Sequence, residues 1–420
     1  MASATPPPGT SDIFPAESWR WRRLERTAAE IFGRYGYGEL RTPIFEYTEV
    51  FQRGLGGETE VVQKEMYTFE DRGGRSLTLR PEGTAGVMRA LLNTDVLNGV
   101  EQRVFYYGPM FRGERPAAGR KRQFHQVGVE NVGRVAPELD AECIAMLMHF
   151  LEALGITGAE LRINSRGVMA DRGPAGELLR GYFQQHLDGM CPDCRVRFEH
   201  NLWRILDCKQ PGCRAIVAGA PDYFHAYSAE SQHYFERVLR ALDALGVSYR
   251  VDRELVRGLD YYVHTVFEIV HTAGLGAQNA IAGGGRYELL LPEQSRPVQG
   301  VGFAAGIERL LLTQDALGAA GEPEKGKTVF LASLGEAARM ENLKLAAELR
   351  RAGFPVALEV EDKSMKAQMR TANRLGASVV LIRGDQEIAS GVVAVKPMDG
   401  GEQREIALAD VKDFLSQTLG

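Results

Sequence analysis

The chain has 420 residues, of which 44% are hydrophobic and 25% charged, and its formal net charge is −5. This length predicts two or three domains, and the composition is typical of a soluble globular protein. No apolar run approaches the roughly 18 residues of a membrane span, and the first residues lack the charged and apolar regions of an export signal. We therefore expect a cytoplasmic protein without a membrane partner, in which local basic patches decide any binding to nucleic acid.

The first 92 residues predict a helix followed by short strands. Apolar residues recur on one face over 15–36, which is typical of an amphipathic helix. Residues 39–42 are predicted to form a short strand that Pro43 ends. We expect strand segments over 59–71 and 76–79, and then a helix over 85–92.

The sequence RPEGT at 80–84 precedes that second helix. Pro81 favours an extended Arg80, while Glu82 and Thr84 lie where a helix begins. An acid and a threonine at this place are explained by helix capping alone, because both satisfy free amides in the first turn.

Two strands, 104–112 and 123–132, are predicted on either side of a long polar turn. One face of the second strand carries Phe124, Gln126, Gly128 and Glu130. This face is too polar for a core, so we interpret it as the floor of a ligand site, with Gly128 leaving room for the ligand. Arg112, at the end of the first strand, is placed to reach over that floor.

The turn between these strands is strongly basic. From Arg112 to Arg122 the chain has five cationic side chains and one acid, Glu114, which gives a local charge of +4. A solvated hairpin turn could carry the same charges. A basic turn beside a polar floor and an arginine nevertheless favours an anionic reactant with a larger polyanion docked next to it. The cations of the turn itself are Arg115, Arg120, Lys121 and Arg122.

An apolar helix is predicted over 138–157, and 158–250 alternates charged helices with four clustered cysteines. Their spacing, C-x2-C-x13-C-x4-C, is close to patterns of structural zinc sites. Four reduced thiols in an inserted module explain the same pattern, so we assign no metal ligand at this point. The four are Cys191, Cys194, Cys208 and Cys213, whereas Cys143 lies in an apolar helix and is interpreted as a core residue.

Three further segments are predicted before the C-terminal region. LVRGLDYY at 255–262 leads into a strand over 263–270, on which Tyr262, His264 and Glu268 should share one face. AGGGRY at 282–287 is interpreted as a glycine-rich turn. VGFAAGIERLLL at 301–312 is predicted to be a helix whose small residues press against a sheet, with Arg309 projecting at its far end.

The last hundred residues differ in pattern from the rest. After a linker at 314–327, strands and helices alternate, which predicts a compact α/β domain with parallel strand connections. Its second helix should present a cationic stripe, which is either a solvated surface or a second contact with RNA. The stripe consists of Lys363, Lys366, Arg370 and Arg374.

Five motifs together resemble those of class II aminoacyl-tRNA synthetases of the histidyl type. FRGER followed by RQFHQVGVE resembles the second class II motif, and GVGFAAGIERL resembles the third. The helix at 15–36 and its following strand resemble the first motif, and RPEGT resembles the amino-acid site. LVRGLDYY and AGGGRY as a pair resemble the signatures that separate the histidyl family from other class II enzymes.

The resemblance covers nearly the full length and implies both a fold and an activity. It implies an α+β catalytic domain over 1–325, built on an antiparallel sheet with a helical insertion at about 165–250. It also implies an α/β anticodon-binding domain over 326–420 and a homodimer. The implied reaction is the activation of L-histidine with ATP and Mg²⁺, followed by transfer to the 3′ end of tRNA(His).

The resemblance also implies roles for particular residues. The catalytic side chains would be Arg112, Arg257 and Arg309, which handle phosphate charge. Histidine would be bound by Glu82, Thr84, Arg112, Gln126, Glu130, Arg257, Tyr261, Tyr262 and Tyr287. The tRNA would be bound by Arg115, Arg120, Lys121, Arg122, Lys363, Lys366 and Arg370. Family members often have glutamine and tyrosine at the positions of Ala117 and Lys121 in the basic turn.

Two other functions remain as alternatives. A synthetase-like regulator that senses histidine and controls its biosynthesis typically lacks the signature arginines and the anticodon domain. An RNA-binding module without catalysis would not need a polar pocket. Histidine-dependent ATP–pyrophosphate exchange separates these alternatives from the enzyme.

Overall fold

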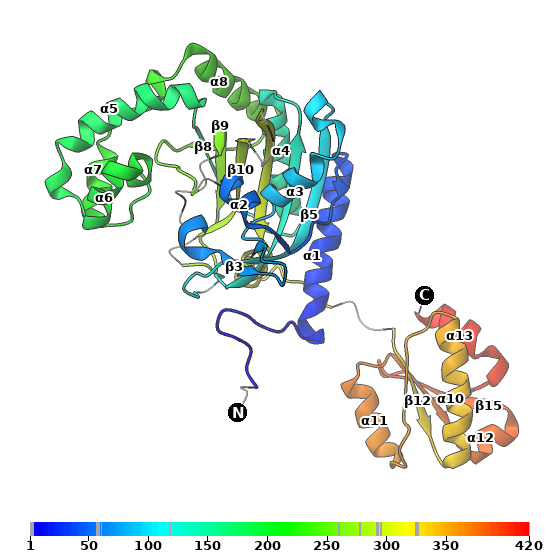
Figure 1. Ribbon diagram of the computed structural model, residues 1–420. Helices are drawn as coiled ribbons and strands as arrows, with labels where there is room; N and C mark the ends of the chain where they lie inside the picture. Colours follow the sequence, from blue (N-terminus) through cyan, green and yellow to red (C-terminus); the bar gives the residue numbers. More distant parts are fainter. Residues whose placement is uncertain are drawn as a thin grey trace. The chain divides into compact units, whose positions relative to one another are not determined.

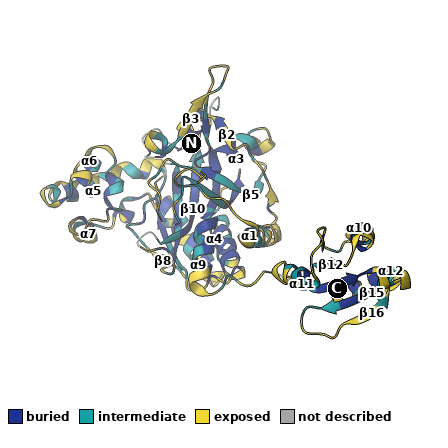
Figure 2. Ribbon diagram, turned by 90° about the horizontal axis from the view of Figure 1, so that it is seen from below, coloured by how far each residue is buried: buried dark blue, intermediate teal, exposed yellow. Residues whose placement is uncertain are grey.

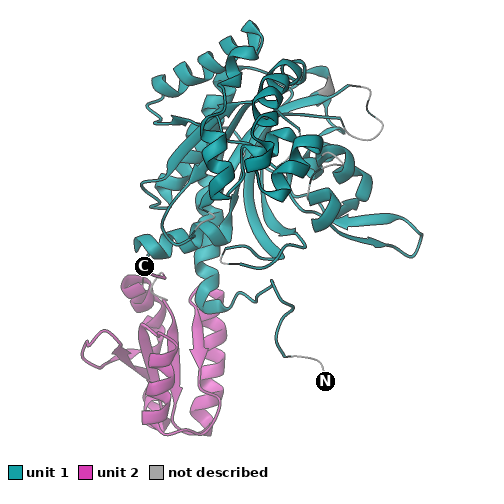
Figure 3. Cartoon of the chain, turned by 90° about the vertical axis from the view of Figure 1, so that its left-hand side faces the viewer, with its two compact units in different colours: residues 1–321 teal, residues 322–420 magenta. Residues whose placement is uncertain are grey.

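The computed structural model describes residues 4–55, 59, 61–117, 119–258, 261–276, 279–290, 294, 296–323 and 327–419. The chain divides into two compact units, residues 1–321 and 322–420 (Figure 3). Within the described ranges, no helix has the length and apolar character needed to cross a membrane.

Unit 1 is built on one large sheet whose strand order is β1-β5-β6-β11-β10-β9-β7-β8. All pairings between β5 and β7 along this order are antiparallel, and only the edge strands β1 and β8 pair in parallel. The predicted antiparallel catalytic fold is therefore confirmed. The strands are β1 (Gly38–Glu39), β5 (Gln102–Phe111), β6 (Gln123–Val132), β7 (Glu160–Ser165), β8 (Arg250–Val251), β9 (Tyr262–Val270), β10 (Ala280–Leu289) and β11 (Val298–Gly306).

Two long helices, α1 (Pro15–Arg34) and α4 (Pro137–Ala153), pack on this sheet and close its main core (Figure 1). The ring of Phe32 from α1 lies 5.2 Å from that of Phe150 on α4 and 5.7 Å from that of Phe303 on β11. Helix α1 thus buries the apolar face that its periodicity predicted, which leaves the opposite face of the sheet for the polar residues of β6.

A smaller three-stranded sheet follows α1 in sequence, in the order β2-β4-β3. Its strands are β2 (Phe45–Tyr47), β3 (Tyr67–Glu70) and β4 (Ser76–Leu79), with helices α2 (Thr48–Leu55) and α3 (Thr84–Leu91) beside it. The prediction of strand over 59–71 is wrong in its first half, because Val61–Glu65 forms a π-helical turn. This run ends in three polar residues without alternation, so it has no face to bury in a sheet.

The segment between β7 and β8 is helical and extends away from the large sheet (Figure 1). Its last helix packs against α4, and its first three helices lie farther out. The helices are α5 (Arg172–Gln184), α6 (Pro192–His200), α7 (Pro211–Ala218) and α8 (Ala229–Ala244).

The helix predicted over 301–312 is wrong in its first half. Residues Val298–Gly306 form strand β11, and only from Ile307 does the chain continue as helix α9 (Ile307–Leu317). Small residues serve close strand packing here, since a Cβ on Gly302 would lie 2.1 Å from Oε2 of Glu130. The linker also begins later than expected, after Gly318 ends α9 with a φ of +66°.

The glycine-rich stretch at 282–287 is not a turn but the interior of strand β10. A Cβ on Gly284 would lie 2.1 Å from the carbonyl oxygen of Gly302 on β11. The close approach of β11 therefore requires glycine at position 284 of β10. Arg286 of the same strand points into the core, where its guanidinium lies 2.5 Å from the carboxylate of Asp140 on α4 and both side chains are fully buried.

The prediction that Tyr262, His264 and Glu268 share one face of β9 is also wrong. His264 has a positive φ of +49°, and the register with β10 shifts at this point. The bulge turns the His264 ring onto Tyr234 of α8, with centroids 4.1 Å apart. Tyr262 and Glu268 therefore reach the polar side of the sheet without His264.

Unit 2 has a five-stranded sheet in the order β13-β12-β14-β15-β16, with apolar clusters on both faces. The parallel connections predicted from sequence hold for β13, β12 and β14, but β15 and β16 are antiparallel, so the sheet is mixed. The elements are β12 (Val329–Ser333), α10 (Glu336–Arg351), β13 (Val356–Leu358), α11 (Met365–Arg374), β14 (Val379–Arg383), α12 (Asp385–Ser390), β15 (Val392–Pro397), β16 (Arg404–Ala407) and α13 (Val411–Leu419).

Candidate active site

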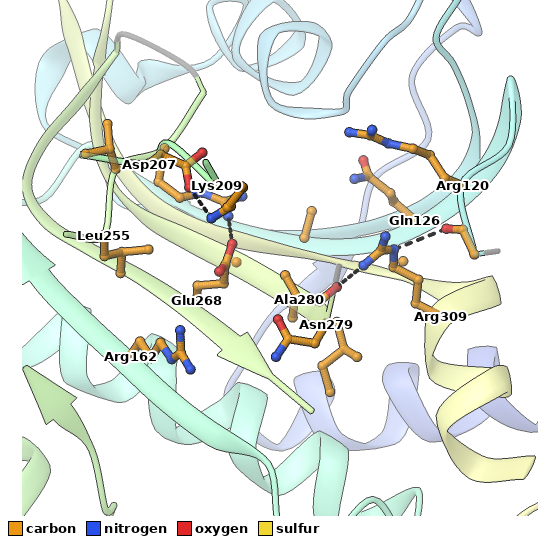
Figure 4. Close-up of a pocket in the computed structure, with 18 of the residues that line it drawn as sticks. Arg120, Gln126, Arg162, Asp207, Lys209, Leu255, Glu268, Asn279, Ala280 and Arg309 are labelled. Carbon is orange, nitrogen blue, oxygen red and sulfur yellow. Dashed lines mark hydrogen bonds and ion pairs between the residues drawn. The ribbon is translucent and has the colours of Figure 1, made fainter. Parts of the chain in front are cut away.

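A large cleft of about 690 Å³, here called the outer cleft, lies over the polar side of the large sheet of unit 1. Arg112, Arg257 and Arg309 all line it, although they come from three distant parts of the sequence. In Figure 4, Arg309 and Arg120 lie on one side, while Asp207 and Lys209 lie near Glu268 on the other. The three predicted catalytic arginines are therefore brought into one cavity.

A second, smaller cavity of about 60 Å³, here called the inner pocket, shares Arg112, Gln126 and Arg257 with the outer cleft. Every residue predicted to bind the amino acid lines it. They are Glu82, Thr84, Arg112, Gln126, Glu130, Arg257, Tyr261, Tyr262 and Tyr287. The pocket also includes Tyr106, Gly283, Gly302, Phe303 and Ala304.

Glu130, toward the end of β6, is a buried acid of the inner pocket with a strongly raised pKa. Its side chain is buried, and burial raises its pKa to about 8 despite a hydrogen bond that the Thr84 hydroxyl donates to Oε1 over 2.7 Å. Oε2 accepts no hydrogen bond from the described residues. A carboxyl group in this state has one oxygen available for a polar group of a ligand.

Glu82 has two roles in the structure. Its carboxylate accepts hydrogen bonds from the backbone amides of Thr84, at 2.6 Å, and Ala85, at 2.8 Å. The capping explanation for RPEGT is thus correct for Glu82 but wrong for Thr84, whose hydroxyl donates to Glu130 instead of capping an amide. The same carboxyl lines the inner pocket, where burial raises its pKa, so capping holds it in place beside Glu130.

Sequence reasoning missed Tyr106 of β5, which is opposite Gly128 of β6 in the antiparallel register. A Cβ on Gly128 would lie 2.5 Å from the Tyr106 hydroxyl oxygen, so the tyrosine takes the space we had expected a ligand to use. Burial raises the pKa of Tyr106 well above its usual value, which keeps its hydroxyl neutral. The hairpin register, once assumed, places an aromatic residue against this glycine and could have revealed it.

Each of the three arginines is held by the protein before any ligand arrives. Nε of Arg112 donates to the carbonyl of Pro81 at 2.9 Å, and its guanidinium lies 5.3 Å from the Phe124 ring centroid. Nη1 of Arg257 donates to Oε1 of Glu268 at 2.6 Å. Nε of Arg309 donates to the carbonyl of Gly119 at 3.1 Å. Such anchoring reduces the entropy lost when a phosphate binds.

Arg257 occupies a particular position against β10. A Cβ on Gly283 would lie 2.7 Å from its guanidinium carbon, so the glycine of AGGGRY gives this side chain its space. Burial alone lowers the pKa of Arg257, but Tyr262 and Glu268 outweigh it and the net shift is upward. The side chain is consequently a permanent cation at the border of both cavities.

The basic turn is less charged than its sequence indicates. Glu114 pairs with Arg120 and lies 3.8 Å from Arg112, and Nζ of Lys121 donates to the Ser11 hydroxyl at 2.7 Å. Of the four cations of the turn, Arg120 and Lys121 line the outer cleft, together with Glu114. Arg115 is exposed outside that lining, and Nε of Arg122 donates to the Glu114 carbonyl.

In unit 2, the prediction that Lys363 belongs to a cationic stripe on a helix is wrong. Helix α11 begins at Met365, so Lys363 precedes it, and its ammonium pairs with Glu359 at 3.3 Å and Glu361 at 2.9 Å. Lys366 and Arg370 are exposed on the helix. The usable stripe is therefore shorter by one residue.

Residues from the helical segment between β7 and β8 also line the outer cleft, and no sequence signal indicated this. They include Asp207, Lys209 and Arg214, followed in sequence by Asp252 and Glu254 next to β8. Their distance in sequence from the other lining residues hides their proximity, which arises only in the folded chain.

Comparison with known proteins is consistent with this geometry. Residues 9–171 and 213–310 match the family described as histidyl-tRNA synthetase, and 328–418 match the anticodon binding domain. A histidine–tRNA ligase from Halothermothrix orenii is 48% identical over 98% of this chain and 99% of its own length. The crystal structure of apo S. aureus histidyl-tRNA synthetase aligns with a TM-score of 0.82 and 37% identity, over 98% of this chain and all of that one. The chain belongs to the histidyl-tRNA synthetase family.

Proposed function

We propose that this chain activates L-histidine with ATP to histidyl-adenylate and then transfers the histidyl group to the 3′ end of tRNA(His), releasing pyrophosphate and AMP. One observation carries the proposal. The inner pocket, lined by two buried acids and several tyrosines, joins a cleft with three anchored arginines. A small polar substrate in the first cavity would thus be held next to a polyanionic one in the second.

Histidine recognition requires polar partners for both ring nitrogens, and the pocket offers them. Oε2 of Glu130 can pair with one ring nitrogen, as a donor when the carboxyl is protonated and as an acceptor when it is ionised, and the neutral hydroxyl of Tyr262 suits the other nitrogen. Glu82, Thr84 and Gln126 provide oxygen atoms for the ammonium group. An amino acid with an apolar side chain would leave these buried groups unpaired, which discriminates strongly against it.

In the activation step a histidine carboxylate oxygen attacks the α-phosphorus of ATP in line. A new bond forms between that oxygen and phosphorus, and the bond from phosphorus to the bridging oxygen of pyrophosphate breaks. Arg112 would contact the α-phosphate and the carboxylate, and Arg257 would offset the charge that develops on the α-phosphate. Arg309 would hold the γ-phosphate.

In the transfer step a hydroxyl of the terminal ribose attacks the carbonyl carbon of the adenylate, and AMP leaves with the former carboxylate oxygen. No protein nucleophile is needed in either step, because positioning and fixed positive charge provide most of the acceleration. This accords with a site built from arginines, acids and tyrosines.

Mg²⁺ fits the donor chemistry of the outer cleft, since it prefers oxygen ligands and usually keeps substrate phosphates among them. Glu268, which pairs with Arg257 at 2.6 Å, and Glu114, which lies 3.8 Å from Arg112, are lining carboxylates next to two of the three arginines and would hold the ion together with phosphate oxygens. When bound, the ion would neutralise phosphate charge.

The tRNA would be bound by two groups of cations. Arg115, Arg120, Lys121 and Arg122 lie in the basic turn of unit 1, near the cleft that would receive the acceptor end. Lys363, Lys366 and Arg370 are in unit 2, which matches an anticodon binding domain. Contacts of this kind to phosphates are strong but sequence-independent.

A homodimer in the cytoplasm is part of the proposal. The small sheet of unit 1 exposes large apolar side chains on β2 and β3, which is unusual for a surface open to water. The ribbon of β3 has the colour of exposed residues in Figure 2. They are Phe45, Tyr47, Tyr67 and Phe69, together with the adjacent Ile44. A second copy of the chain would cover them. Sedimentation should therefore give a dimer at micromolar concentration, and Phe45→Glu with Phe69→Glu should give a monomer; a wild-type chain that sediments as a monomer contradicts the dimer.

Histidine-dependent ATP–pyrophosphate exchange tests the function. We expect exchange with histidine and background rates with the other amino acids, followed by charging of tRNA(His). A non-catalytic regulator of histidine biosynthesis would bind histidine in calorimetry without exchange. An RNA-binding module would do neither, so either result would overturn the proposed enzyme.

A further inference from the structure

The helical segment between β7 and β8 brings four cysteines together. One sulfur atom of each lies within 4.8 Å of all the others, although they are spread over 23 positions of the sequence. Cys191 precedes α6, Cys194 is in its first turn, Cys208 follows a 3₁₀ turn, and Cys213 is in α7. None of them forms a disulfide.

We propose that these four thiols hold one zinc ion in a structural site. Four thiolates around a tetrahedral zinc at about 2.3 Å place neighbouring sulfur atoms about 3.8 Å apart. The Sγ atoms of Cys191 and Cys208 are 3.9 Å apart, so the cluster already has this spacing. The site has no open position for a substrate, which makes it structural rather than catalytic.

Burial favours a metal over four free thiols. Cys194, Cys208 and Cys213 are buried, and Cys191 is partly exposed. Thiols are weak hydrogen-bond donors, so four of them packed against one another gain little unless an ion joins them. The backbone amide of Cys191 donates to Sγ of Cys213 over 3.2 Å, which is the type of contact that stabilises a metal-bound thiolate.

The local fold explains why a metal would be required. Helices α6 and α7 have only 9 and 8 residues, and each begins with a proline at its first position. Helices this short are marginal in water without tertiary support. A metal that joins the start of α6 to the start of α7 supplies this support where the core is small.

The proposed site also bears on the outer cleft. Cys208 lies between Asp207 and Lys209, and both of these line the cleft. Arg214, next to Cys213, pairs with Glu254 at 3.3 Å in the segment that leads to Arg257. The metal would therefore hold one wall of the cleft in place without touching a substrate.

Metal analysis of the purified full chain, expressed with zinc and dialysed without chelator, tests the proposal. We expect one zinc per chain in the wild type, and release of that zinc when a mercurial reagent modifies the thiols. Cys213→Ser and Cys191→Ser should lose stoichiometric zinc. Cys143→Ala, which removes the buried thiol outside the cluster, should keep it.

A second measurement keeps the test decisive if a serine variant fails to fold. Wild-type protein grown with cobalt in place of zinc should show the intense visible absorption of tetrahedral cobalt bound to thiolates. Wild-type chain without stoichiometric metal would overturn the proposal. So would full zinc in Cys213→Ser, or a mass spectrum with disulfides among the four cysteines in protein prepared without oxidant.

Discussion

The inner pocket and the outer cleft lie side by side and share Arg112, Gln126 and Arg257, yet they are built in opposite ways. The inner pocket is small, and its acids and phenols are buried, with pKa values raised by loss of water. The outer cleft is about ten times larger, since it measures about 690 Å³ against about 60 Å³, and its arginines and acids are paired with one another.

This difference separates the two tasks of the proposed reaction. Buried polar groups without partners are costly, so they select a ligand that satisfies all of them. Paired charges at an open cleft cost less, and they exchange their partners for phosphate oxygens when a nucleotide binds. Specificity for the amino acid therefore belongs to the pocket, and handling of phosphate belongs to the cleft.

The largest expected effect comes from removing Arg257, which lines both cavities. Arg257→Ala should lower histidine-dependent pyrophosphate exchange by about 10²–10³-fold, because it removes a fixed charge at the α-phosphate and leaves Glu268 without its partner. A radiometric pyrophosphate-exchange assay measures the rate directly. Arg53→Ala, which removes an exposed arginine of α2 that pairs with Glu49, is the matched control and should retain wild-type exchange. If Arg257→Ala lowers the exchange rate by less than about tenfold, Arg257 does not stabilise the charge on the α-phosphate.

Changing the pocket alone should affect histidine more than ATP. Glu130→Ala should lower kcat/KM for histidine by at least about tenfold, because it removes the group that pairs with a ring nitrogen. Glu130→Gln should also lower it, because the amide keeps an acceptor oxygen but replaces the titratable carboxyl oxygen with an NH₂ donor. The KM for ATP should change little, since Glu130 does not line the outer cleft. Equal effects on both substrates would show that pocket and cleft are not separate.

The raised pKa of Glu130 predicts a stability signature for the same variant. A carboxyl with a pKa of about 8 when folded and 4.5 when unfolded stabilises the folded state fully below pH 4.5, and this contribution is lost as pH rises to 8. Glutamine does not titrate. The unfolding free energy of Glu130→Gln relative to wild type should therefore rise with pH over this range, by about 1.4 kcal/mol per pH unit at most. A difference independent of pH between 5 and 8 would contradict the buried, protonated state.

A smaller effect is expected at the rim of the cleft. Arg115→Ala removes an exposed cation of the basic turn and should raise the KM for tRNA several-fold while leaving pyrophosphate exchange at the wild-type rate. Aminoacylation assays at two salt concentrations test this. If exchange falls together with aminoacylation, the turn contributes to the cleft and not only to tRNA binding.

The smallest effect is expected in unit 2. Lys366→Ala with Arg370→Ala should weaken tRNA binding modestly and lower the slope of log affinity against log salt by roughly one for each residue. Lys344→Ala on α10, an exposed lysine paired with Glu341, is the control and should leave the slope unchanged. An unchanged slope in the double variant would mean that α11 is only a solvated surface.

Much of this molecule could be predicted from local patterns. Helix α1, the hairpin of β5 and β6, and the polar face of β6 follow from periodicity, because burial of one face imposes it on the sequence. The residues of the inner pocket were predicted from motifs that resemble a known family. The glycine-rich stretch and the start of α9 were misjudged, because small residues suit a turn, a helix surface and a crowded strand equally well.

The sequence by itself determined which chemical groups the chain has and the period at which they recur. Only the tertiary structure decided that Tyr106 fills the space above Gly128, that a bulge at His264 divides a strand face, and that Arg286 turns into the core. It also decided that four cysteines meet within 4.8 Å and that Asp207 reaches the cleft. The physical reason is that these outcomes depend on contacts between residues far apart in the chain, where no local period records the neighbour.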